Sequence, residues 1–258
     1  MNLLNPNNLF VGKVAKFIKN IDSTNSYAKN LLSKSNPIEG TVICAGNQQA
    51  GRGQIGSAWQ SEADKNLLLS IILLPKFLQA SQQFMLSKVV CLAATELLYF
   101  LGIDQNDVWI KWPNDLYVGD LKIGGILIEN QLKGHYLHNS VIGIGLNINQ
   151  SLFDPSLANP TSVLLQTGQN NPINIVLKRY CELLEPYYLQ LKATNYKPIN
   201  QAYLERLLGY KKWRYFYLKR TKHRIRAQII GVHESGQLCL QTEHKQLNCS
   251  LKEIVFEF

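Results

Sequence analysis

A glycine-rich segment that carries a single cation is the first part of the chain whose residues suit ligand chemistry. Gly51-Arg52-Gly53-Gln54-Ile55-Gly56 follows the polar pair Gln48-Gln49. Glycines let backbone N–H groups approach a ligand closely, and an arginine can grip a carboxylate or phosphate through two parallel hydrogen bonds. The segment therefore suits an anionic ligand, although an ordinary surface loop with a solvated Arg52 fits the same residues.

The Gly-x-Gly-x-x-Gly spacing also occurs in dinucleotide-binding turns. Such turns need a helix directly after the glycines and an acidic residue about twenty residues further on. The residues after Gly56 show no apolar helical stripe, and no Asp or Glu occurs between Lys65 and Thr95. No Gly-Lys-Ser/Thr follows either, so both the dinucleotide and the P-loop interpretations are rejected.

A second cation, Lys122, is the only charged residue in the apolar run from Leu121 to Ile128. Lysine is rarely buried without an anionic partner, because desolvating an unpaired ammonium is costly. The run also contains Gly124-Gly125, and glycines inside a strand often mark a bulge or a close approach by a ligand. Either Lys122 faces an anion, or its ammonium reaches solvent at the end of the strand.

Two further segments combine polar side chains with strand patterns. In Lys111-Trp112-Pro113-Asn114-Asp115, the proline keeps Trp112 out of the helical region, which predicts that Asn114 and Asp115 occupy a turn at the tip of a strand. In the strand predicted at 141–149, alternate positions place only glycines and amides on one face. That face, on which a planar ligand could lie, consists of Gly143, Gly145, Asn147 and Asn149.

The hydrophobic pattern predicts the strands and helices that must position these residues. Strands are predicted at 14–18, 41–45, 66–74, 108–111, 121–129 and 141–149. Helices are predicted at about 24–32, 81–101, 173–191 and 200–208, with capping oxygens from Asp22-Ser23-Thr24 before the first. The pattern at 81–101 is that of the clearest amphipathic helix. Together these elements predict an α+β domain over residues 1–208.

The pattern changes after Gly209 to short strands, including 225–232, 238–241 and 254–258, which predicts a small β-barrel over 209–258. Most of the excess charge lies there. Residues 210–226 hold eight Lys and Arg and no acidic residue, so the rest of the chain is nearly neutral although the net charge is +9. A basic, aromatic stretch of this kind leaves open a nucleic-acid-binding role.

Composition excludes several classes of protein. With 46% apolar and 17% charged residues, the chain is not of the disordered class. Its longest apolar run, 67–74, is too short to span a bilayer, and no apolar signal-peptide core follows its start. Five scattered cysteines without a Cys-x-x-Cys pair argue against a disulfide framework or zinc site. We therefore expect a cytoplasmic protein without membrane association.

Taken in order, the motifs resemble those of biotin–protein ligases. They are Ser23-Thr24-Asn25, Gln48-Gln49-Ala50-Gly51-Arg52-Gly53, Trp59, Lys111-Trp112-Pro113-Asn114-Asp115, Lys122-x-Gly124-Gly125-Ile126-Leu127 and Gly143-x-Gly145-x-Asn147-x-Asn149. The resemblance covers about residues 14–150 motif by motif and the C-terminal barrel by architecture. It implies an α+β fold: a mixed-sheet catalytic domain of the biotin/lipoate ligase type, similar to class II synthetases, followed by an SH3-like β-barrel.

The resemblance implies an ATP-dependent ligase with two steps. The biotin carboxylate attacks the α-phosphate of MgATP to give biotinyl-5′-AMP and pyrophosphate. A lysine of a biotin carboxyl carrier protein, usually that of acetyl-CoA carboxylase, then takes the biotin. Mg²⁺ would arrive with ATP rather than occupy a dedicated metal site, and the ligase would be a monomer or a homodimer.

The resemblance also implies roles for individual residues. The implied catalytic residues are Arg52 and Lys122, which would hold the carboxylate and the α-phosphate, and Asp115. The implied biotin-binding residues are Ser23, Thr24, Asn25, Gln48, Gly51, Arg52, Gly53, Gln54, Lys122, Gly124 and Gly125. The implied nucleotide-binding residues are Arg52, Trp59, Lys111, Asn114, Asp115, Gly145, Asn147 and Asn149. Asp115 is also a candidate for orienting the incoming lysine amine, with capping of the turn as the alternative.

The chain departs from the common family pattern GRGRxGRxW, because Gln54 and Ser57 stand where arginines are frequent. Two fewer cations predict faster loss of the adenylate, with biotinylation itself retained. Only 22 residues precede Ser23, too few for a helix-turn-helix, so a monofunctional ligase without DNA binding is expected. The alternatives are a lipoate or octanoate ligase of the same fold, or a non-enzymatic nucleic-acid-binding module that uses 210–226.

Overall fold

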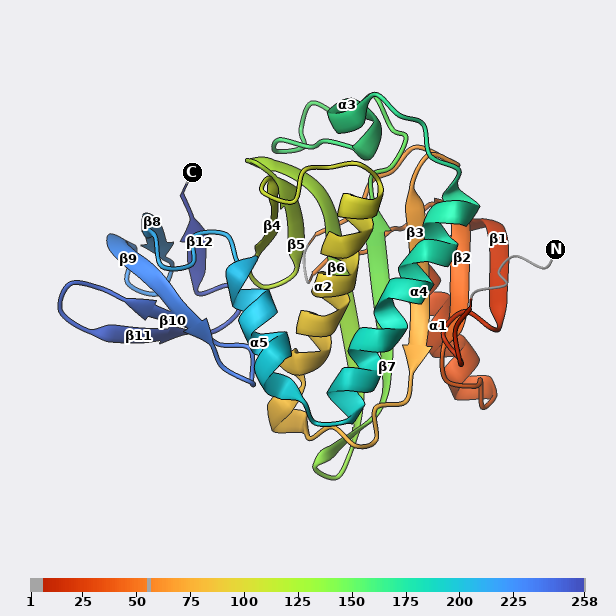
Figure 1. The fold of residues 1–258 in the computed structure, drawn as a ribbon, viewed down its shortest axis with the longest axis horizontal. Coiled ribbons are helices and arrows are strands. Elements are labelled where there is room, and N and C mark those ends of the chain that lie inside the picture. The colour runs from red at the N-terminus through yellow and green to blue at the C-terminus, as the bar shows by residue number, and fades with distance from the viewer. Residues whose placement is uncertain (1–6, 55–56, 258) are drawn as a thin grey trace.

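A seven-stranded sheet forms the centre of the larger part of the molecule (Figure 1). The structure is a computed structural model and describes residues 7–54 and 57–257. The strands lie in the order β1-β2-β3-β7-β6-β5-β4. β1 and β2 are parallel and all other neighbours are antiparallel, so the sheet is mixed, as predicted. Their bounds are β1 Ala15–Ile21, β2 Thr41–Gln48, β3 Leu67–Leu73, β4 Val108–Lys111, β5 Asp115–Val118, β6 Leu121–Lys133 and β7 Tyr136–Leu146.

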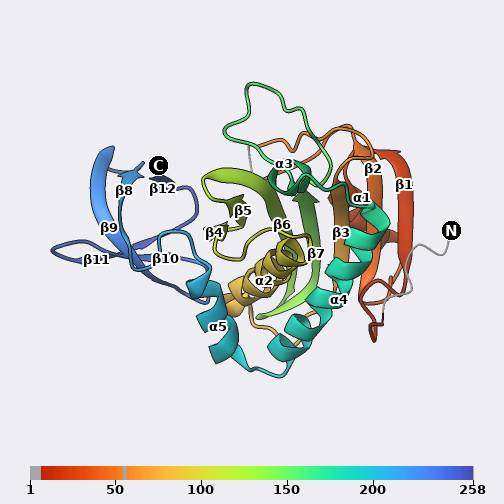
Figure 2. The same ribbon diagram turned by 45° about the horizontal axis from the view of Figure 1, so that its top comes forward.

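Helices cover both faces of this sheet (Figures 1 and 2). The helices α2 (Phe84–Phe100), α4 (Ile173–Lys192) and α5 (Tyr196–Glu205) lie together on one face. Helix α1 (Thr24–Lys34) lies on the other, where Ala28 packs against apolar residues of β2, β3 and β7. A 3-10 turn, η1 (Ala80–Gln82), precedes α2, and the short helix α3 (Val163–Thr167) follows β7.

Helix α1 begins where the sequence predicts. The side chain of Ser23 caps it by accepting a hydrogen bond from the backbone N–H of Ser26. Thr24 and Asn25, in the first turn, are buried. The cap thus satisfies a free helical N–H and also fixes the two side chains that follow it at the edge of the sheet.

Helix α2 differs from its prediction. It forms over the expected residues, but it is buried on nearly all sides rather than amphipathic, because α4 and α5 cover its outer face. Its apolar pattern is also long enough to span a membrane when extended back to Ala80, but 72% of that window is buried inside the protein. The pattern is therefore that of a core helix.

Three other predicted boundaries were wrong. Strand β7 ends at Leu146, so Asn147 and Asn149 do not continue the face formed by Gly143 and Gly145. Asp115 is not in a turn but is the first residue of the unpredicted strand β5, where it pairs with Lys111. The helix predicted at 200–208 begins and ends earlier, as α5.

The C-terminal strands form a second, five-stranded sheet in the order β11-β10-β9-β8-β12. It is antiparallel throughout, and its bounds are β8 Trp213–Leu218, β9 His223–Val232, β10 Leu238–Gln241, β11 Gln246–Cys249 and β12 Ile254–Phe256. The predicted strand 254–258 extends to Phe258, which lies outside the described residues. The α+β class with a separate C-terminal β unit is confirmed, whereas the boundary between 208 and 209 stays a prediction.

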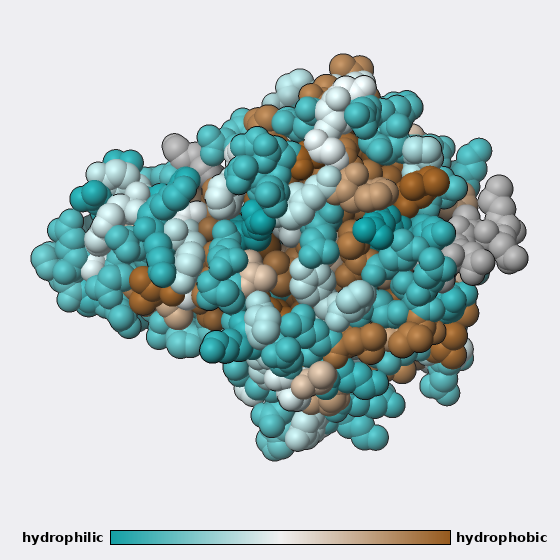
Figure 3. Space-filling model, viewed as in Figure 1, coloured by the Kyte–Doolittle hydropathy of each residue, from teal (hydrophilic) through white to brown (hydrophobic). Residues whose placement is uncertain are grey.

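The basic stretch lies on β8 and β9 of this second sheet. Arg224 stacks on the ring of Tyr215, with 3.9 Å from its guanidinium carbon to the ring centroid, and Arg226 lies over Trp213 at 5.2 Å. Arg224 also pairs with Glu257 and Arg226 with Glu243. The end of the molecule that this sheet forms is largely hydrophilic in the view of Figure 3.

Candidate active site

The candidate active site lies on the face of the seven-stranded sheet that also carries α1. Strands β3, β6 and β7 present Ser70, Gly125, Gly143 and Gly145 toward this face, and small residues leave room above the strands. A cavity forms over them, closed at the sides by α1, the segment after β2 and the β4–β5 turn. It is lined by Ser23, Thr24, Asn25, Gln48, Arg52, Gly53, Gln54, Ser57, Ala58, Trp59, Leu69, Pro113, Asn114, Asp115, Lys122, Gly125, Ile126, Leu127, Gly143, Ile144 and Gly145.

Two glycines of β7 set the depth of the cavity. A Cβ atom on Gly143 would lie 2.3 Å from Asn25 Oδ1, and one on Gly145 would lie 2.4 Å from Cε2 of the Trp59 ring. Each glycine therefore lets a polar or aromatic side chain approach the strand backbone more closely than any other residue would allow.

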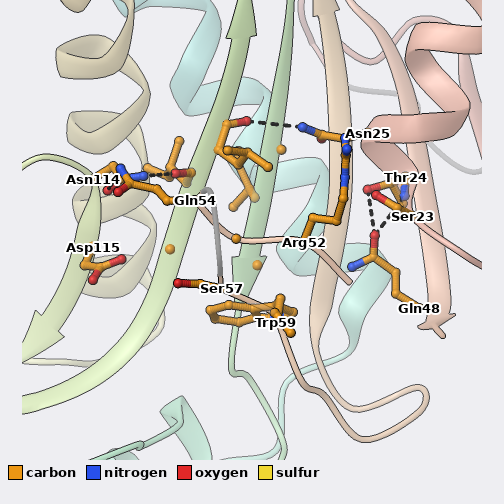
Figure 4. Close-up of a pocket in the computed structure, with 18 of the residues that line it drawn as sticks. Ser23, Thr24, Asn25, Gln48, Arg52, Gln54, Ser57, Trp59, Asn114 and Asp115 are labelled. Atoms are coloured by element: carbon orange, nitrogen blue, oxygen red, sulfur yellow. Dashed lines mark hydrogen bonds between the residues drawn. The ribbon is translucent and has the colours of Figure 1, made fainter. Parts of the chain in front are cut away.

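The end of the cavity near α1 is built from uncharged groups that hydrogen-bond one another (Figure 4). Gln48 Oε1 accepts hydrogen bonds from the backbone N–H of Thr24 at 2.8 Å and from its hydroxyl at 3.1 Å. Ser70 Oγ lies 2.8 Å from Thr24 Oγ1 and donates to Asn25 Oδ1 at 2.5 Å. These side chains are held in one arrangement before any ligand enters. We refer to Ser23, Thr24, Asn25, Gln48 and Ser70 as the neutral end.

Arg52 lies between the two ends and is bound to a carboxylate. Its Nη2 lies 2.9 Å from Glu129 Oε2, and Lys29 Nζ lies 2.7 Å from Glu129 Oε1. Asn25 Nδ2 donates to Glu129 as well, at 3.0 Å. Partial burial would raise the pKa of Glu129, but the hydrogen bonds from Lys29 and Asn25 and the charge of Arg52 outweigh it and lower that pKa. Glu129 therefore stays ionised and is shared by Arg52 and Lys29, so the three side chains together keep one positive charge.

The opposite end of the cavity carries charges. Lys122 Nζ lies 2.8 Å from Asp115 Oδ1, and about a third of each side chain is exposed. Gln54 Nε2 donates to Asn114 Oδ1 at 3.0 Å, and the Asn114 amide donates to the Ile126 carbonyl. We refer to Gln54, Asn114, Asp115 and Lys122 as the charged end. Of the two alternatives left open for Lys122, the anionic partner is the one that forms, and it is Asp115.

A second cavity lies beside the first and shares Trp59 and Lys122 with it. Its wall also includes Tyr117, Asn147 and Phe153. Two polar atoms at this place, Trp59 Nε1 and Asn147 Oδ1, are buried and have no hydrogen-bond partner among residues 7–54 and 57–257. Buried polar groups are almost always paired in folded proteins, so these two atoms indicate a place for a ligand or a water molecule.

Most residues predicted to bind ligands come together at the first cavity. They are Ser23, Thr24, Asn25, Gln48, Arg52, Gly53, Gln54, Trp59, Asn114, Asp115, Lys122, Gly125 and Gly145. Ile55 and Gly56 of the glycine segment lie outside the described residues. Among residues 7–54 and 57–257, no group of three His, Cys, Asp or Glu side chains is placed to hold a metal ion.

Five predicted residues do not line this cavity. The Gly51 carbonyl accepts a 2.9 Å hydrogen bond from the backbone N–H of Trp59. A Cβ atom on Gly124 would meet the side chain of Leu146 in the core. Lys111 lines a neighbouring groove, and Asn147 lines the second cavity. Asn149 exchanges two 2.8 Å hydrogen bonds with the backbone of residue 171, which makes its part structural.

Comparisons with known proteins identify the family of this chain. The model of the biotin/lipoate A/B protein ligase family matches residues 17–147, which hold every residue of both ends of the cavity. The chain belongs to this family. The structure of the family member from Aquifex aeolicus, biotin protein ligase in complex with biotin and ATP, has the same fold with a TM-score of 0.78. It is 24% identical and covers 95% of this chain and 99% of its own.

Curated relatives in the family include ligases of two kinds. The chain is 31% identical over 196 residues to the biotin–acetyl-CoA-carboxylase ligase of Paracoccus denitrificans, covering 72% of this chain and 77% of the relative. It is 29% identical over 228 residues to the bifunctional ligase/repressor BirA of Bacillus spizizenii, covering 86% of this chain and 68% of that one. The five-stranded C-terminal sheet is consistent with the SH3-like unit predicted from the family resemblance.

Sequence reasoning missed two residues that organise the site. Glu129 ends the predicted strand 121–129 and is its only acidic residue, a signal that it pairs with one of the nearby cations. Ser70 interrupts the apolar run 67–74 on the face toward α1, and a hydroxyl in an otherwise apolar strand is a signal for a buried polar partner.

Proposed function

We propose that this family member is an ATP-dependent biotin–protein ligase, which activates biotin as biotinyl-5′-AMP and transfers it to a lysine of a biotin carboxyl carrier protein. The observation that carries the proposal is the composition of the cavity. One end holds neutral donors and acceptors suited to a polar, uncharged ring, and the cations Arg52 and Lys122 line the same cavity. Biotin has this character, since an uncharged ureido ring lies at one end and a carboxylate at the other.

The neutral end binds the ring of biotin. Thr24, Asn25 and Gln48 offer hydroxyl and amide groups at the cavity wall, and Gly143 leaves space over β7. These side chains are oriented by one another and by Ser70. Little side-chain ordering is then left for the moment of binding, which preserves affinity.

The two cations exchange partners when anions arrive. In the first step an oxygen of the biotin carboxylate bonds to the α-phosphorus of ATP, and the bond from that phosphorus to the bridging oxygen of pyrophosphate breaks. Arg52 leaves Glu129 for the carboxylate, and Lys122 leaves Asp115 for the α-phosphate. Fixed cations are needed because two anions meet and charge accumulates on the phosphoryl oxygens.

The second cavity takes the adenine base. Its aromatic walls, Trp59 and Phe153, suit a planar ring, and Asn147 Oδ1 is an acceptor that needs a donor such as the exocyclic amine of adenine. Because Lys122 lines both cavities, the α-phosphate lies at their junction. Asn114 and Asp115 supply oxygen atoms of the kind that Mg²⁺ prefers, and the ion, carried by ATP, would neutralise phosphate charge there.

The second step needs an acceptor protein at the mouth of the site. The amine nitrogen of the acceptor lysine bonds to the acyl carbon of biotinyl-AMP, the carbon–oxygen bond to AMP breaks, and the amine loses a proton. Asp115 orients that amine. The groove lined by Gln54, Lys111, Lys219 and Lys252 adjoins the charged end and would favour an acidic partner surface. We place the reaction in the cytoplasm.

Incubation of the purified protein with biotin and MgATP tests the proposal. Mass spectrometry should detect biotinyl-AMP, and addition of a biotin carboxyl carrier domain should convert it to the biotinylated domain and AMP. Parallel reactions with lipoate or octanoate distinguish the related ligase. The proposal is wrong if the wild-type protein forms lipoyl-AMP or no adenylate at all.

A further inference from the structure

A buried lysine that the proposed reaction does not use lies where the two sheets meet. Lys88 is on α2 and only 2% exposed. Its ammonium donates to Asn200 Oδ1 of α5 at 2.7 Å and to the Val232 carbonyl of β9 at 3.3 Å. Burial lowers the pKa of Lys88 to about 8, partly offset by the charge of Glu234. A single side chain thus ties α2 to α5 and to the C-terminal sheet.

The loop that follows Val232 is also held on the start of α2. The backbone N–H of Phe84 donates to the Glu234 carbonyl at 3.2 Å, and Gln82 Nε2 donates to the Glu234 carboxylate at 3.0 Å. Gly236 has a φ of +98° and packs so closely that an added Cβ would lie 2.8 Å from the Phe84 ring. These contacts hold the loop 233–237 in one position against the start of α2, the helix that carries Lys88.

This loop and helix α5 both reach the turn that forms the charged end of the cavity. The indole N–H of Trp112 donates to the Gly236 carbonyl at 3.0 Å, and Trp112 is only 4% exposed. The Tyr203 hydroxyl of α5 donates to the Pro113 carbonyl at 3.4 Å. The Tyr203 ring also lies 5.7 Å from the Lys88 ammonium. Pro113 and the next residue, Asn114, line the active-site cavity.

We infer that Lys88 is a positioning residue for adenylate formation. It fastens α5 and Val232, the residue of β9 from which the loop 233–237 continues, to α2. Helix α5 and the loop then hold the Trp112–Asn114 turn through the Tyr203 hydroxyl and the Gly236 carbonyl. An apolar residue of similar size would fill much of the same space but would lose the directional hydrogen bonds that fix Asn200 and Val232 relative to α2. This inference rests on the proposed function, since it assigns Lys88 an effect at the nucleotide side of that site.

The variant Lys88→Met keeps an unbranched side chain one atom shorter and removes the ammonium. We expect the single-turnover rate of biotinyl-AMP formation to fall about tenfold, because small displacements of reacting groups cost rate steeply. The KM for ATP should rise, whereas the KM for biotin should stay within about twofold, because the residues of the neutral end lie at the start of α1, on β2 and on β3 and not in the β4–β5 turn. A role in stability alone would lower the melting temperature and leave both KM values unchanged.

Two more variants keep the test decisive. Trp112→Phe removes the indole N–H together with part of the ring and should give the same kinetic pattern, and the double variant should be little worse than either single one, since both act on the position of the loop 233–237. Thr95→Val, equally buried on α2 but away from the loop, is the control and should leave the kinetics unchanged. If Lys88→Met does not fold, Asn200→Ala takes its place.

Two results would overturn the inference: normal kinetics in Lys88→Met and Trp112→Phe, or an equal loss in Thr95→Val. Failure of the proposed function would look different, because the wild-type protein itself would then form no biotinyl-AMP.

Discussion

The two ends of the active-site cavity are built in opposite ways. At the neutral end, Thr24, Asn25 and Gln48 hydrogen-bond within the end itself and with Ser70, so the groups are in place before a ligand arrives. At the charged end and at Arg52, each cation is instead paired with a carboxylate, Asp115 for Lys122 and Glu129, which Lys29 shares, for Arg52. A neutral ring can enter a preformed site, whereas an anion enters by replacing a carboxylate. In the proposed function, the neutral end therefore binds the ring of biotin, and Arg52 and Lys122 bind the reacting anions.

The largest effect should come from removing the cation at the charged end. In Lys122→Ala we expect biotinyl-AMP formation to fall about a thousandfold, because the charge that builds on the α-phosphate loses a direct partner. Biotin binding, measured by calorimetry without ATP, should weaken far less. Lys133→Ala, an exposed lysine of the same strand, is the control and should keep wild-type rates. Equal losses in binding and rate would remove the distinction between the two ends.

A smaller effect is expected from the neutral end. Gln48→Ala should raise the KM for biotin about tenfold, because buried donors such as those of Thr24 then lose their acceptor. The KM for ATP should be unchanged. The exposed neighbour Gln49→Ala serves as the matched control. A parallel rise in the KM for ATP would mean that the two ends of the cavity do not bind the two substrates separately.

A further prediction concerns position 54, where this chain has glutamine and the family pattern often has arginine. Gln54 lines the cavity and bonds Asn114, so Gln54→Arg places a cation beside the adenylate. We expect biotinyl-AMP to dissociate about fivefold more slowly, a gain of the size expected for one partly exposed charge. Gel filtration after adenylate formation measures the retained intermediate, and Gln169→Arg adds the same charge at an exposed distant position. An unchanged dissociation rate would refute the idea.

The basic turn between β8 and β9 should matter to the second step only. Reversing the charges of Lys219, Arg220 and Lys222 to glutamate should slow biotin transfer to the carrier domain about threefold at low salt, and less at high salt. Adenylate synthesis should be spared. Equal loss in both steps would assign the turn to ATP binding or to stability, and binding of single-stranded nucleic acid by the wild type would point to another partner.

The smallest effect concerns the pH dependence of the pair at Arg52. The pKa of Glu129 is lowered in the folded protein from its ordinary value of 4.5, so its stabilising contribution is present above that value and is lost as the pH falls through the lowered one. Melting temperatures of the wild type and Glu129→Gln should therefore differ by a few degrees at pH 7 and converge toward pH 3. A constant difference across this range would argue against the ion pair.

The local structure of the neutral end could be predicted more fully than the pairing at the charged end, although Ser70 was missed. Ser23-Thr24-Asn25 form a helix cap, which short-range physics determines, whereas the binding roles of these residues and of Gln48 rest on the family resemblance. The pairing of Lys122 with Asp115 depends on β5, whose four residues follow a proline and carry too little pattern to predict. Asn147 and Asn149 were misplaced for a similar reason, because where β7 ends depends on the loop that packs against it. Lys88 could not be foreseen, since its partners are more than a hundred residues away.

The central claim is that this cavity joins biotin to AMP, and pyrophosphate exchange tests it most directly. Labelled pyrophosphate is supplied with the protein, MgATP and either biotin, lipoate or no acid. We expect label to appear in ATP only when biotin is present, and we expect Lys122→Ala to lose this exchange. Exchange that depends on lipoate, or no exchange with biotin in the folded wild-type protein, would contradict it.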